Sequence, residues 1–297
     1  MKRYLTYAAL IAFSAALAAR SAAAADDAKP AEPKKPLEIP ANALVLLVMD
    51  PLAAPLSCPC VQGYAQRDYD KLAAYLTSEL GKPVIAAYNA SLPAALKMDT
   101  NDRADIVIGK HSVVLWDAKR AGRQFRPIMA LSGKDGVSTQ NGLFVVLSKD
   151  PAQSVADLKD YRIFFGTQDA DEKYSAAMDT LGKLGIAPPA KPDTCAACSD
   201  GATKLLELGE KARAATVISS YAAPLLEGCG TVKKGDLRVI GKTDNVPFVE
   251  AFVSDKLPAP EQAKIEAALL KVSTDAKLLE ALETLLGFVP IESQKKS

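Results

Sequence analysis

The sequence predicts an α/β protein of two lobes, each with a mixed sheet flanked by helices, joined by a hinge of two crossing segments. Two observations carry this prediction. Short apolar runs alternate along the chain with stretches of helical periodicity, as in βαβ units. A polar segment at 138–141 then separates a first group of runs from a second. With 297 residues, 49% of them hydrophobic, the chain can bury cores of this size.

The balance of charge excludes one class of partner. The chain has 36 Lys and Arg residues against 35 Asp and Glu, a formal net charge of +1, and both signs are spread along it. A nucleic-acid-binding domain needs a basic face that follows the phosphate backbone, and often aromatic side chains that stack on bases. Aromatic residues make up only 6% of this chain. We therefore expect no nucleic acid among its partners.

The N-terminus has the three parts of an export signal. Lys2 and Arg3 precede an apolar stretch over 5–17, which is followed by alanines ending at Ala25, as at a signal-peptidase site. The apolar stretch is shorter than the roughly 20 residues that span a bilayer. We predict a signal peptide over 1–25 that is cleaved near Ala25, a periplasmic mature chain, and no membrane insertion after cleavage.

The rest of the chain divides into a linker and two lobes. Residues 26–42 contain four prolines among Lys and Glu. Such a segment has too little apolar surface to order itself, so it predicts a disordered linker. The order of the apolar runs assigns 43–139 plus 247–297 to the first lobe and 140–246 to the second.

In the first lobe, continuous apolar runs predict strands that are buried on both faces. These runs are 44–48, 84–87, 106–108 and 128–131. Between the first two runs, Leu72, Leu76 and Leu80 recur every fourth residue, which predicts a helix that Gly81 ends. Similar spacings predict further helices over 94–97, 265–272 and 278–285.

The second lobe repeats the pattern, and the chain then returns to the first. Strands are predicted at 142–147, 162–165, 215–218 and 237–240, with a returning strand at 248–253. A helix is predicted over 171–184, with Leu181 and Leu184 facing inward. Another helix is predicted to follow its N-cap, which is either Ser199 or Asp200.

Four stretches resemble a known family of transport receptors. YLTSELGKPV, ending at Val84, resembles its helix-to-strand turn, and ADIVIG, ending at Gly109 and followed by Ser112, resembles its D-x-x-x-G strand. SVADLK, ending at Lys159, resembles the entry to its second lobe, and LRVI before the Val-Pro dipeptide at Val246 resembles its return crossing. The chain thus resembles the phosphate/phosphonate-binding periplasmic proteins, substrate-binding proteins of ABC transporters with the type II periplasmic binding-protein fold.

This resemblance implies a function. It implies a periplasmic solute-binding protein, a monomer without enzymatic activity, that closes on a small ligand and delivers it to an ABC transporter permease or a membrane sensor. The ligand would be a phosphonate-like oxyanion or a thiophilic species. The sequence itself contains no G-x-S-x-G, H-E-x-x-H, P-loop or G-x-G-x-x-G motif, which also argues against catalysis.

The residues that hold the oxyanion in this family are not retained. The family places a Ser/Thr-rich helix start after the strand that here ends at Gly166, but this chain has TQDADE at 167–172. The three acidic side chains of this segment would repel an oxyanion. Ser199 stands near the position of a ligand-contacting His, and the family's Tyr after the D-x-x-x-G strand is absent unless Trp116 replaces it.

Candidate ligand contacts follow from the rule that open α/β sheets bind ligands at the carboxyl ends of their strands. The rule points to several strand ends, Ser219 among them, and from these we select the following residues: Asp50, Tyr88, Ser91, Lys110, His111, Ser112, Thr167, Gln168, Ser199 and Tyr221. Four of them have clear structural alternatives: Asp50 as a turn residue, Lys110 as a solvated charge, His111 as a structural side chain, and Tyr221 as part of the core. His111 is the only histidine, so sites built from several histidines are excluded.

Cysteine is the unusual residue of this chain. Five cysteines in an oxidising compartment cannot all pair within one chain. Cys58 and Cys60 fall on one predicted loop and Cys195 and Cys198 on another, so closure of the lobes would bring four thiolates together around copper, zinc or arsenite. The alternatives are structural disulfides, with Cys229 as one partner, or a redox-active pair. No cofactor is required, and a periplasmic metal-handling or redox accessory protein remains the alternative function.

Overall fold

The computed structural model of the chain describes residues 37–57 and 66–291. The predicted signal peptide, most of the predicted linker, and the loop with Cys58 and Cys60 lie outside the described residues. Among the helices that are described, none is both long and apolar enough to cross a membrane.

The end of the predicted linker is part of the packed structure. Leu37 packs against a core cluster of the first lobe, and the compact unit of the chain starts at this residue. Ala43 donates a backbone hydrogen bond to the carbonyl of Pro40. Packing therefore begins at Leu37 rather than at Ala43, because the apolar side chain of Leu37 finds a place in the core.

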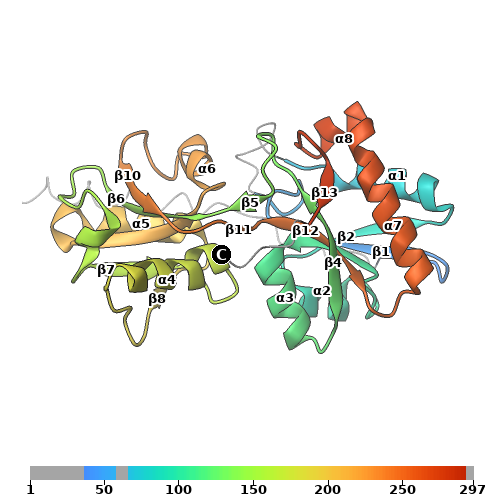
Figure 1. Cartoon of the computed structure of the whole chain (residues 1–297), viewed down its shortest axis with the longest axis horizontal. Helices are drawn as coiled ribbons and strands as arrows, with labels where there is room; N and C mark the ends of the chain where they lie inside the picture. Colours follow the sequence, from blue (N-terminus) through green and yellow to red (C-terminus); the bar gives the residue numbers. More distant parts are fainter. Residues whose placement is uncertain (1–36, 58–65, 292–297) are drawn as a thin grey trace, which may run out of the picture. The chain divides into compact units, whose positions relative to one another are not determined.

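A six-stranded mixed sheet organises the first lobe, in the order β13-β4-β12-β3-β1-β2 (Figure 1). β1, β2 and β3 run parallel, whereas β12 lies antiparallel between β3 and β4. The chain therefore leaves this sheet and later returns to it. The strands are β1 (Leu44–Met49), β2 (Val84–Tyr88), β3 (Ile106–Lys110), β4 (Phe125–Leu131), β12 (Val249–Ser254) and β13 (Phe288–Pro290).

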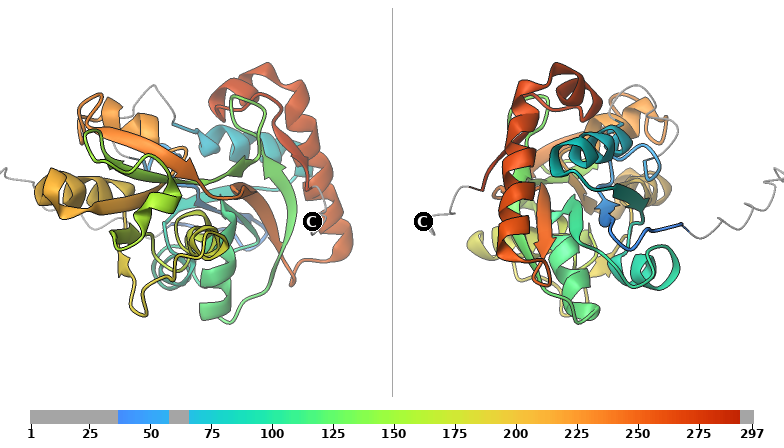
Figure 2. Two further views of the ribbon diagram at one scale, coloured as in Figure 1. Left: turned by 60° about the vertical axis from the view of Figure 1, so that its left-hand side comes forward. Right: turned by 90° about the vertical axis from the view of Figure 1, so that its right-hand side faces the viewer.

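Helices cover both faces of this sheet, because its central strands are apolar on both sides. In β1, Leu46 and Val48 belong to one core cluster, and Leu47 and Met49 to another. The first cluster is covered by α1 (Tyr69–Leu80), α7 (Ala259–Lys271) and α8 (Ala276–Ala281), and the other by α2 (Leu92–Met98) and α3 (His111–Arg120). Figure 2 shows α1 and α7 side by side.

A five-stranded sheet, also mixed, organises the second lobe in the order β10-β6-β9-β7-β8. β6 is antiparallel to β9 and β10, while β7 is parallel to β8 and β9. The strands are β6 (Gly142–Leu147), β7 (Arg162–Phe165), β8 (Asp193–Thr194), β9 (Ala214–Ser219) and β10 (Leu237–Lys242). The flanking helices are α4 (Ser175–Lys183), α5 (Cys198–Leu208) and α6 (Ala223–Gly228).

Two short strands connect the sheets. β5 (Thr139–Gln140) leads into β6, and β11 (Val246–Pro247) leads into β12. They pair antiparallel, with Val246 opposite Gln140. This pairing confirms the predicted hinge of two crossing segments, and the two mixed sheets with flanking helices confirm the predicted fold class.

Most helices lie where periodicity predicted them, but α3 and α6 were not predicted. The apolar stripe of α3 is narrow: Val114 and Ala118 are buried, whereas Leu115 and Trp116 are about two-fifths exposed. Such a helix gives a weak periodic signal. By contrast α1 ends as expected at Gly81, which has a φ of 64° and donates its N–H to the carbonyl of Thr77.

The segment predicted as one helix over 171–184 has two parts. A 3₁₀ turn, η3 (Asp171–Lys173), precedes α4. Leu181 is buried as predicted, but Leu184 is 48% exposed, because α4 ends at Lys183 and Leu184 leaves the buried stripe. The other 3₁₀ turns are η2 (Val155–Leu158), η4 (Glu210–Ala212) and η5 (Val272–Thr274).

The predicted N-cap of α5 was wrong. The helix begins at Cys198, its N-cap residue is Ala197, and Ser199 lies in its first turn. The side chain of Asp200 folds back and accepts the N–H of Ala197. This carboxylate therefore caps the start of the helix, although Asp200 itself lies within the helix.

Candidate functional site

Lys110 is the charged residue that the fold places at the centre of a contact between the lobes. It ends β3, whose five residues are all buried, and it is itself 6% exposed. β1 and β2 run parallel to β3, so all three strands end at the same edge of the sheet. The next residue, His111, begins α3, and the positive end of that helix dipole adds to the charge of the ammonium group.

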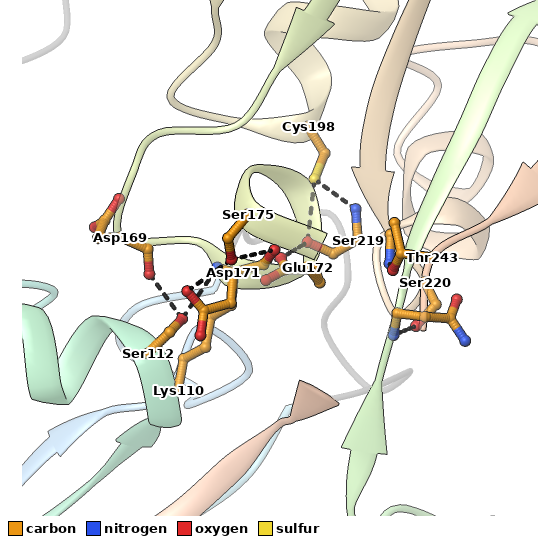
Figure 3. A network of polar contacts seen from close by, with 12 residues as sticks. Lys110, Ser112, Asp169, Asp171, Glu172, Ser175, Cys198, Ser219, Ser220 and Thr243 are labelled. Atoms are coloured by element: carbon orange, nitrogen blue, oxygen red, sulfur yellow. Dashed lines mark hydrogen bonds and ion pairs between the residues drawn. The ribbon is translucent and has the colours of Figure 1, made fainter. Parts of the chain in front are cut away.

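The ammonium group of Lys110 is paired with a carboxylate from the second lobe. Its Nζ lies 2.5 Å from Oε1 of Glu172, a residue of the η3 turn that is 0% exposed (Figure 3). Taking this pair out of water is costly unless further hydrogen bonds complete it. A second donor does reach Oε1: the hydroxyl of Ser219, at the end of β9, lies 2.5 Å away.

A close backbone approach holds the η3 turn in this place. A Cβ atom on Gly142, the first residue of β6, would lie 2.0 Å from the backbone oxygen of Glu172. A Cβ on Gly166, just after β7, would lie 2.5 Å from Cβ of Lys173. Two glycines therefore let the turn settle against the sheet, which directs Glu172 toward Lys110.

The other oxygen of this carboxylate has no partner among the described residues. Oε2 of Glu172 is buried and accepts no hydrogen bond from the described part of the chain. An unsatisfied buried acceptor of this kind costs about 1–3 kcal/mol. The carboxylate is therefore held firmly at one oxygen and left open at the other.

The charge around Lys110 is partly unbalanced. Lys173, next to Glu172, is also only 6% exposed. Burial lowers the pKa of Lys110, and the positive charge of Lys173 acts in the same direction, while Glu172 opposes both effects. Two buried ammonium groups thus share the vicinity of one buried carboxylate.

Further hydrogen bonds extend this contact on both sides (Figure 3). Ser112 donates its hydroxyl to the carbonyl of Asp169, 2.7 Å away, and accepts the N–H of Asp171 at 3.3 Å. On the other side, Sγ of Cys198 accepts the N–H of Ser219 at 3.3 Å. We call these two neighbouring groups of contacts together the lobe-contact network; its members are Lys110, Ser112, Asp169, Asp171, Glu172, Cys198 and Ser219.

A second buried cluster, in the first lobe, surrounds Asp50. Its Oδ2 accepts Nη1 of Arg67 at 2.8 Å and the hydroxyl of Tyr69 at 2.5 Å, and its Oδ1 accepts the N–H of Leu52 at 2.9 Å. The sequence offered Asp50 as a ligand contact or, alternatively, as a turn residue. Asp50 does accept the N–H of Leu52 in a turn, and its other oxygen is paired with a cation of the chain itself.

Tyr221 lies between this cluster and the lobe-contact network. Its ring stacks on that of Phe248 with centroids 4.9 Å apart, and the guanidinium of Arg67 lies 5.8 Å from the centroid of the same Phe248 ring. Burial raises the pKa of Tyr221 well above its ordinary value, and the charges of Cys198, Glu172 and Asp50 raise it further. Tyr221 therefore forms a wall beside the network and also packs against the core.

Other predicted site residues have partners elsewhere. His111 Nδ1 lies 2.5 Å from Oε2 of the buried Glu250, and the hydroxyl of Tyr88 donates to Asp70. Ser91 precedes α2 as its N-cap residue without a side-chain cap bond. None of these bonds joins the lobe-contact network.

The remaining candidates of the second lobe also lie outside the network. Thr167 and Gln168 precede the η3 turn; Gln168 is exposed, and its amide reaches the hydroxyl of Tyr174 at 3.5 Å. Ser199 lies in the first turn of α5. Trp116, the candidate replacement for the family's Tyr, is 41% exposed on α3.

The described cysteines do not form the predicted pairs. Cys195, Cys198 and Cys229 are all free, so a disulfide among them was a wrong expectation. Cys195 is buried in a cluster with Phe164 and Leu205, whereas Cys198 packs against a different cluster. Over 37–57 and 66–291, no three His, Cys, Asp or Glu side chains form a group that could hold a metal ion. The predicted partners Cys58 and Cys60 lie outside those ranges.

Sequence reasoning missed the acceptor at the centre of the network. Glu172 was counted only among acids that repel an oxyanion, and Ser219, although named at a strand end, was not among the residues selected as contacts. A signal did exist for Ser219, which ends a predicted strand in the same way as Lys110 does. Glu172 gave no such signal, because the sequence alone does not show that this acidic side chain is buried.

Three comparisons relate this chain to known proteins. A family model described as the periplasmic phosphonate substrate-binding protein of ABC transporters matches residues 62–295, well over half of the chain. None of the curated proteins matches the sequence. Many solved structures share the fold.

Three of these structures illustrate the likeness. A Xanthomonas citri protein solved with ATP has a TM-score of 0.62 at 16% identity, covering 85% of this chain and 92% of its own. A binding component of a Pseudomonas aeruginosa phosphonate ABC transporter has 0.61 at 13%, covering 84% and 81%. PhnD1 from Prochlorococcus marinus, solved with methylphosphonate, has 0.58 at 12%, covering 85% and 93%. At such identities the likeness concerns the fold.

Proposed function

Because the chain belongs to the family of periplasmic substrate-binding proteins of phosphonate ABC transporters, we propose that it binds a small oxyanion beside Lys110. Proteins of this family bind small ligands and deliver them to an ABC transporter permease. For this chain we infer export through the signal peptide at 1–25, cleavage near Ala25, and action as a monomer. A membrane sensor is the other partner to which closure on a ligand can be signalled.

The observation that carries this proposal is the buried ammonium group of Lys110. It stands at the edge where three parallel strands end, at the start of α3, and with a second buried lysine, Lys173, close enough to shift its pKa. Positive charge with few surrounding waters favours an anionic ligand more strongly than an exposed lysine does. Ser112 and Ser219 supply hydroxyl donors next to it.

The choice of oxyanion rests on the family, and its contacts differ from the family's pattern. The Ser/Thr-rich helix start of the family is replaced here by the segment that carries Glu172. Lys110 is therefore the charge partner that we assign to the ligand. The metal-handling and redox alternative gains no support, since the described cysteines lie in separate clusters.

Titration of the mature protein tests the proposal. Methylphosphonate, inorganic phosphate and sulfate are added while Tm is followed, with the uncharged dimethyl methylphosphonate as control. Saturation to about 100 times Kd stabilises a protein by about 2.7 kcal/mol, so an anion that binds raises Tm by several degrees. Solution scattering of the same samples should record the radius of gyration of the protein. If no anion raises Tm, the proposed ligand class is wrong.

A pair of lysine variants tests the position of the site. Lys110→Met should weaken binding of the active anion at least about tenfold, the equivalent of one lost charge-assisted hydrogen bond. Lys119→Met removes an exposed lysine from the same helix, α3, and should leave the affinity unchanged. Circular dichroism verifies that both variants are folded. Equal affinity of Lys110→Met and the unmodified protein would show that the anion binds elsewhere.

A further inference from the structure

The carboxylate of Glu172 occupies the place on Lys110 that the anion of a ligand needs. Its Oε1 receives the ammonium group of Lys110 from one lobe and the hydroxyl of Ser219 from the other, each at 2.5 Å. Donors from two lobes that converge on one anionic oxygen are the arrangement expected around a bound oxyanion in a two-lobed receptor. Here the oxygen belongs to the chain.

The hydrogen bonding of the Glu172 carboxylate is incomplete. The side chain is fully buried, yet Oε2 has no hydrogen-bond partner in the described part of the chain. A phosphonate or phosphate group has three or more oxygens and can use several donors at once, whereas Glu172 satisfies one of its two oxygens. The carboxylate of Glu172 is thus a weaker partner of Lys110 than a well-fitting oxyanion would be.

Three glycines fix the backbone that carries Glu172 and Ser219. Gly142 and Gly166 allow the η3 turn to lie against the sheet. Gly201 does the same for α5, since a Cβ there would lie 2.3 Å from Oγ1 of Thr216 in β9. The backbone that carries Glu172 and Ser219 is therefore closely packed. This packing places the carboxylate opposite Lys110.

We propose that Glu172 is a tethered competitor for the oxyanion site: it holds Lys110 when no ligand is present, and a ligand binds by displacing it. This inference rests on the proposed function and assigns a specificity-determining role to one residue. A ligand reaches Lys110 only in the fraction of molecules in which Glu172 has left, so its apparent Kd is the intrinsic Kd divided by that fraction. Ligands with few anionic oxygens lose the most affinity through this competition with Glu172.

Removing the charge of Glu172 tests the inference with methylphosphonate as the probe. Glu172→Gln should bind methylphosphonate at least about tenfold more tightly than the unmodified protein, the factor expected if Glu172 holds Lys110 in nine of ten molecules. Glu207→Gln is the matched control, because it changes the net charge equally at an exposed position of α5. It should leave Kd within about twofold.

A shorter carboxylate separates competition from repulsion. Glu172→Asp keeps the negative charge but shortens the side chain by one methylene, so the carboxylate no longer reaches Lys110 at its present distance. We expect an intermediate gain in affinity, about threefold, for this variant. The change is also mild enough to preserve the fold should Glu172→Gln disturb it. No gain with Glu172→Asp would mean that the charge of Glu172 merely repels the ligand, and would overturn the inference.

Calorimetric titration of the four proteins distinguishes the two levels of failure. If methylphosphonate binds the unmodified protein and all variants with one Kd, the tethered competitor is refuted and the proposed function stands. If it binds neither the unmodified protein nor Glu172→Gln, the assignment of an oxyanion to Lys110 is itself refuted. A gain confined to the Glu172 variants supports both.

Discussion

Asp50 and Glu172, two of the buried carboxylates among the described residues, are paired with cations in different ways. Both are 0% exposed and both bond to a buried basic side chain, at 2.8 Å in the Asp50–Arg67 pair and 2.5 Å in the Glu172–Lys110 pair. Asp50 has partners on both oxygens. Glu172 receives its two donors on one oxygen, and no donor from residues 37–57 and 66–291 reaches the other.

The difference teaches how one fold can use buried charge for two purposes. The partners of Asp50 all come from the first lobe, close to it in sequence, so the cluster forms with that lobe and stays closed. The partner of Glu172 comes from the other lobe, 62 residues away. A pair that forms only when lobes meet, and that leaves an oxygen free, is one that a ligand can exchange.

The largest effect is expected from breaking the closed pair. Arg67→Met leaves the carboxylate of Asp50 buried without its cation, which should lower the free energy of unfolding by about 3–5 kcal/mol. Urea denaturation measures this change. Arg162→Met is the control, because Arg162 and Asp193 form an exposed pair that should contribute about 0–1 kcal/mol. Similar losses in both variants would remove the distinction between the buried cluster and a surface ion pair.

The next effect concerns the turn that carries Glu172. Gly142→Ala puts a Cβ 2.0 Å from the backbone oxygen of Glu172, so the turn must move, which should destabilise the protein by about 1–3 kcal/mol. Binding of methylphosphonate should become tighter, since the carboxylate is displaced from Lys110. Gly182→Ala in α4 has no atom within 4 Å of the new Cβ and should be neutral or stabilising. A stable Gly142→Ala with unchanged affinity would contradict the role of this close approach.

A smaller effect should appear in the pH dependence of stability. The pKa of Lys110 in the folded protein is lowered, below the unfolded value of about 10.4. Between the two values the unfolded chain binds more protons, so the free energy of unfolding should rise with pH through this window. Denaturation at a series of pH values should show this rise in the unmodified protein relative to Lys110→Met. Parallel curves for the two proteins would mean that Lys110 is not shifted by burial.

The smallest effect is expected at Tyr88, a predicted site residue outside the network. Tyr88→Phe removes the hydrogen bond to Asp70 and should cost about 0.5–1.5 kcal/mol. Burial raises the pKa of Tyr88 above its ordinary value of 10. The stability from this shift is therefore present below about pH 10 and is lost above it. Tyr88→Phe has no hydroxyl to ionise, so its stability should not show this fall above about pH 10. The affinity for methylphosphonate should not change; a weakened affinity would bring Tyr88 back into the site.

The fold could be predicted because its strands are continuous apolar runs. The run that became β1 is buried on both faces, and such runs are visible without knowledge of their neighbours. α3 was missed because only Val114, Asp117 and Ala118 of it are buried. The split between η3 and α4 depends on contacts with Gly142 and Gly166, which are remote from the helix pattern.

The site could be predicted only in part. The strand-end rule located Lys110, Ser112 and Tyr221, because it depends on the direction of strands and not on their partners. It also selected Tyr88 and Ser91, at the end of the outermost strand β2, whose partners lie within the first lobe. Glu172 escaped prediction because its burial arises from a close backbone approach between segments thirty residues apart.

A crystal structure of the unmodified protein with methylphosphonate tests the central claim most directly. We expect a phosphonate oxygen within hydrogen-bond distance of Nζ of Lys110, about 2.7–2.9 Å, with the carboxylate of Glu172 turned away from it. A bound phosphonate located elsewhere, with the Lys110–Glu172 bond still in place, would contradict both the assigned site and the displacement of its internal occupant.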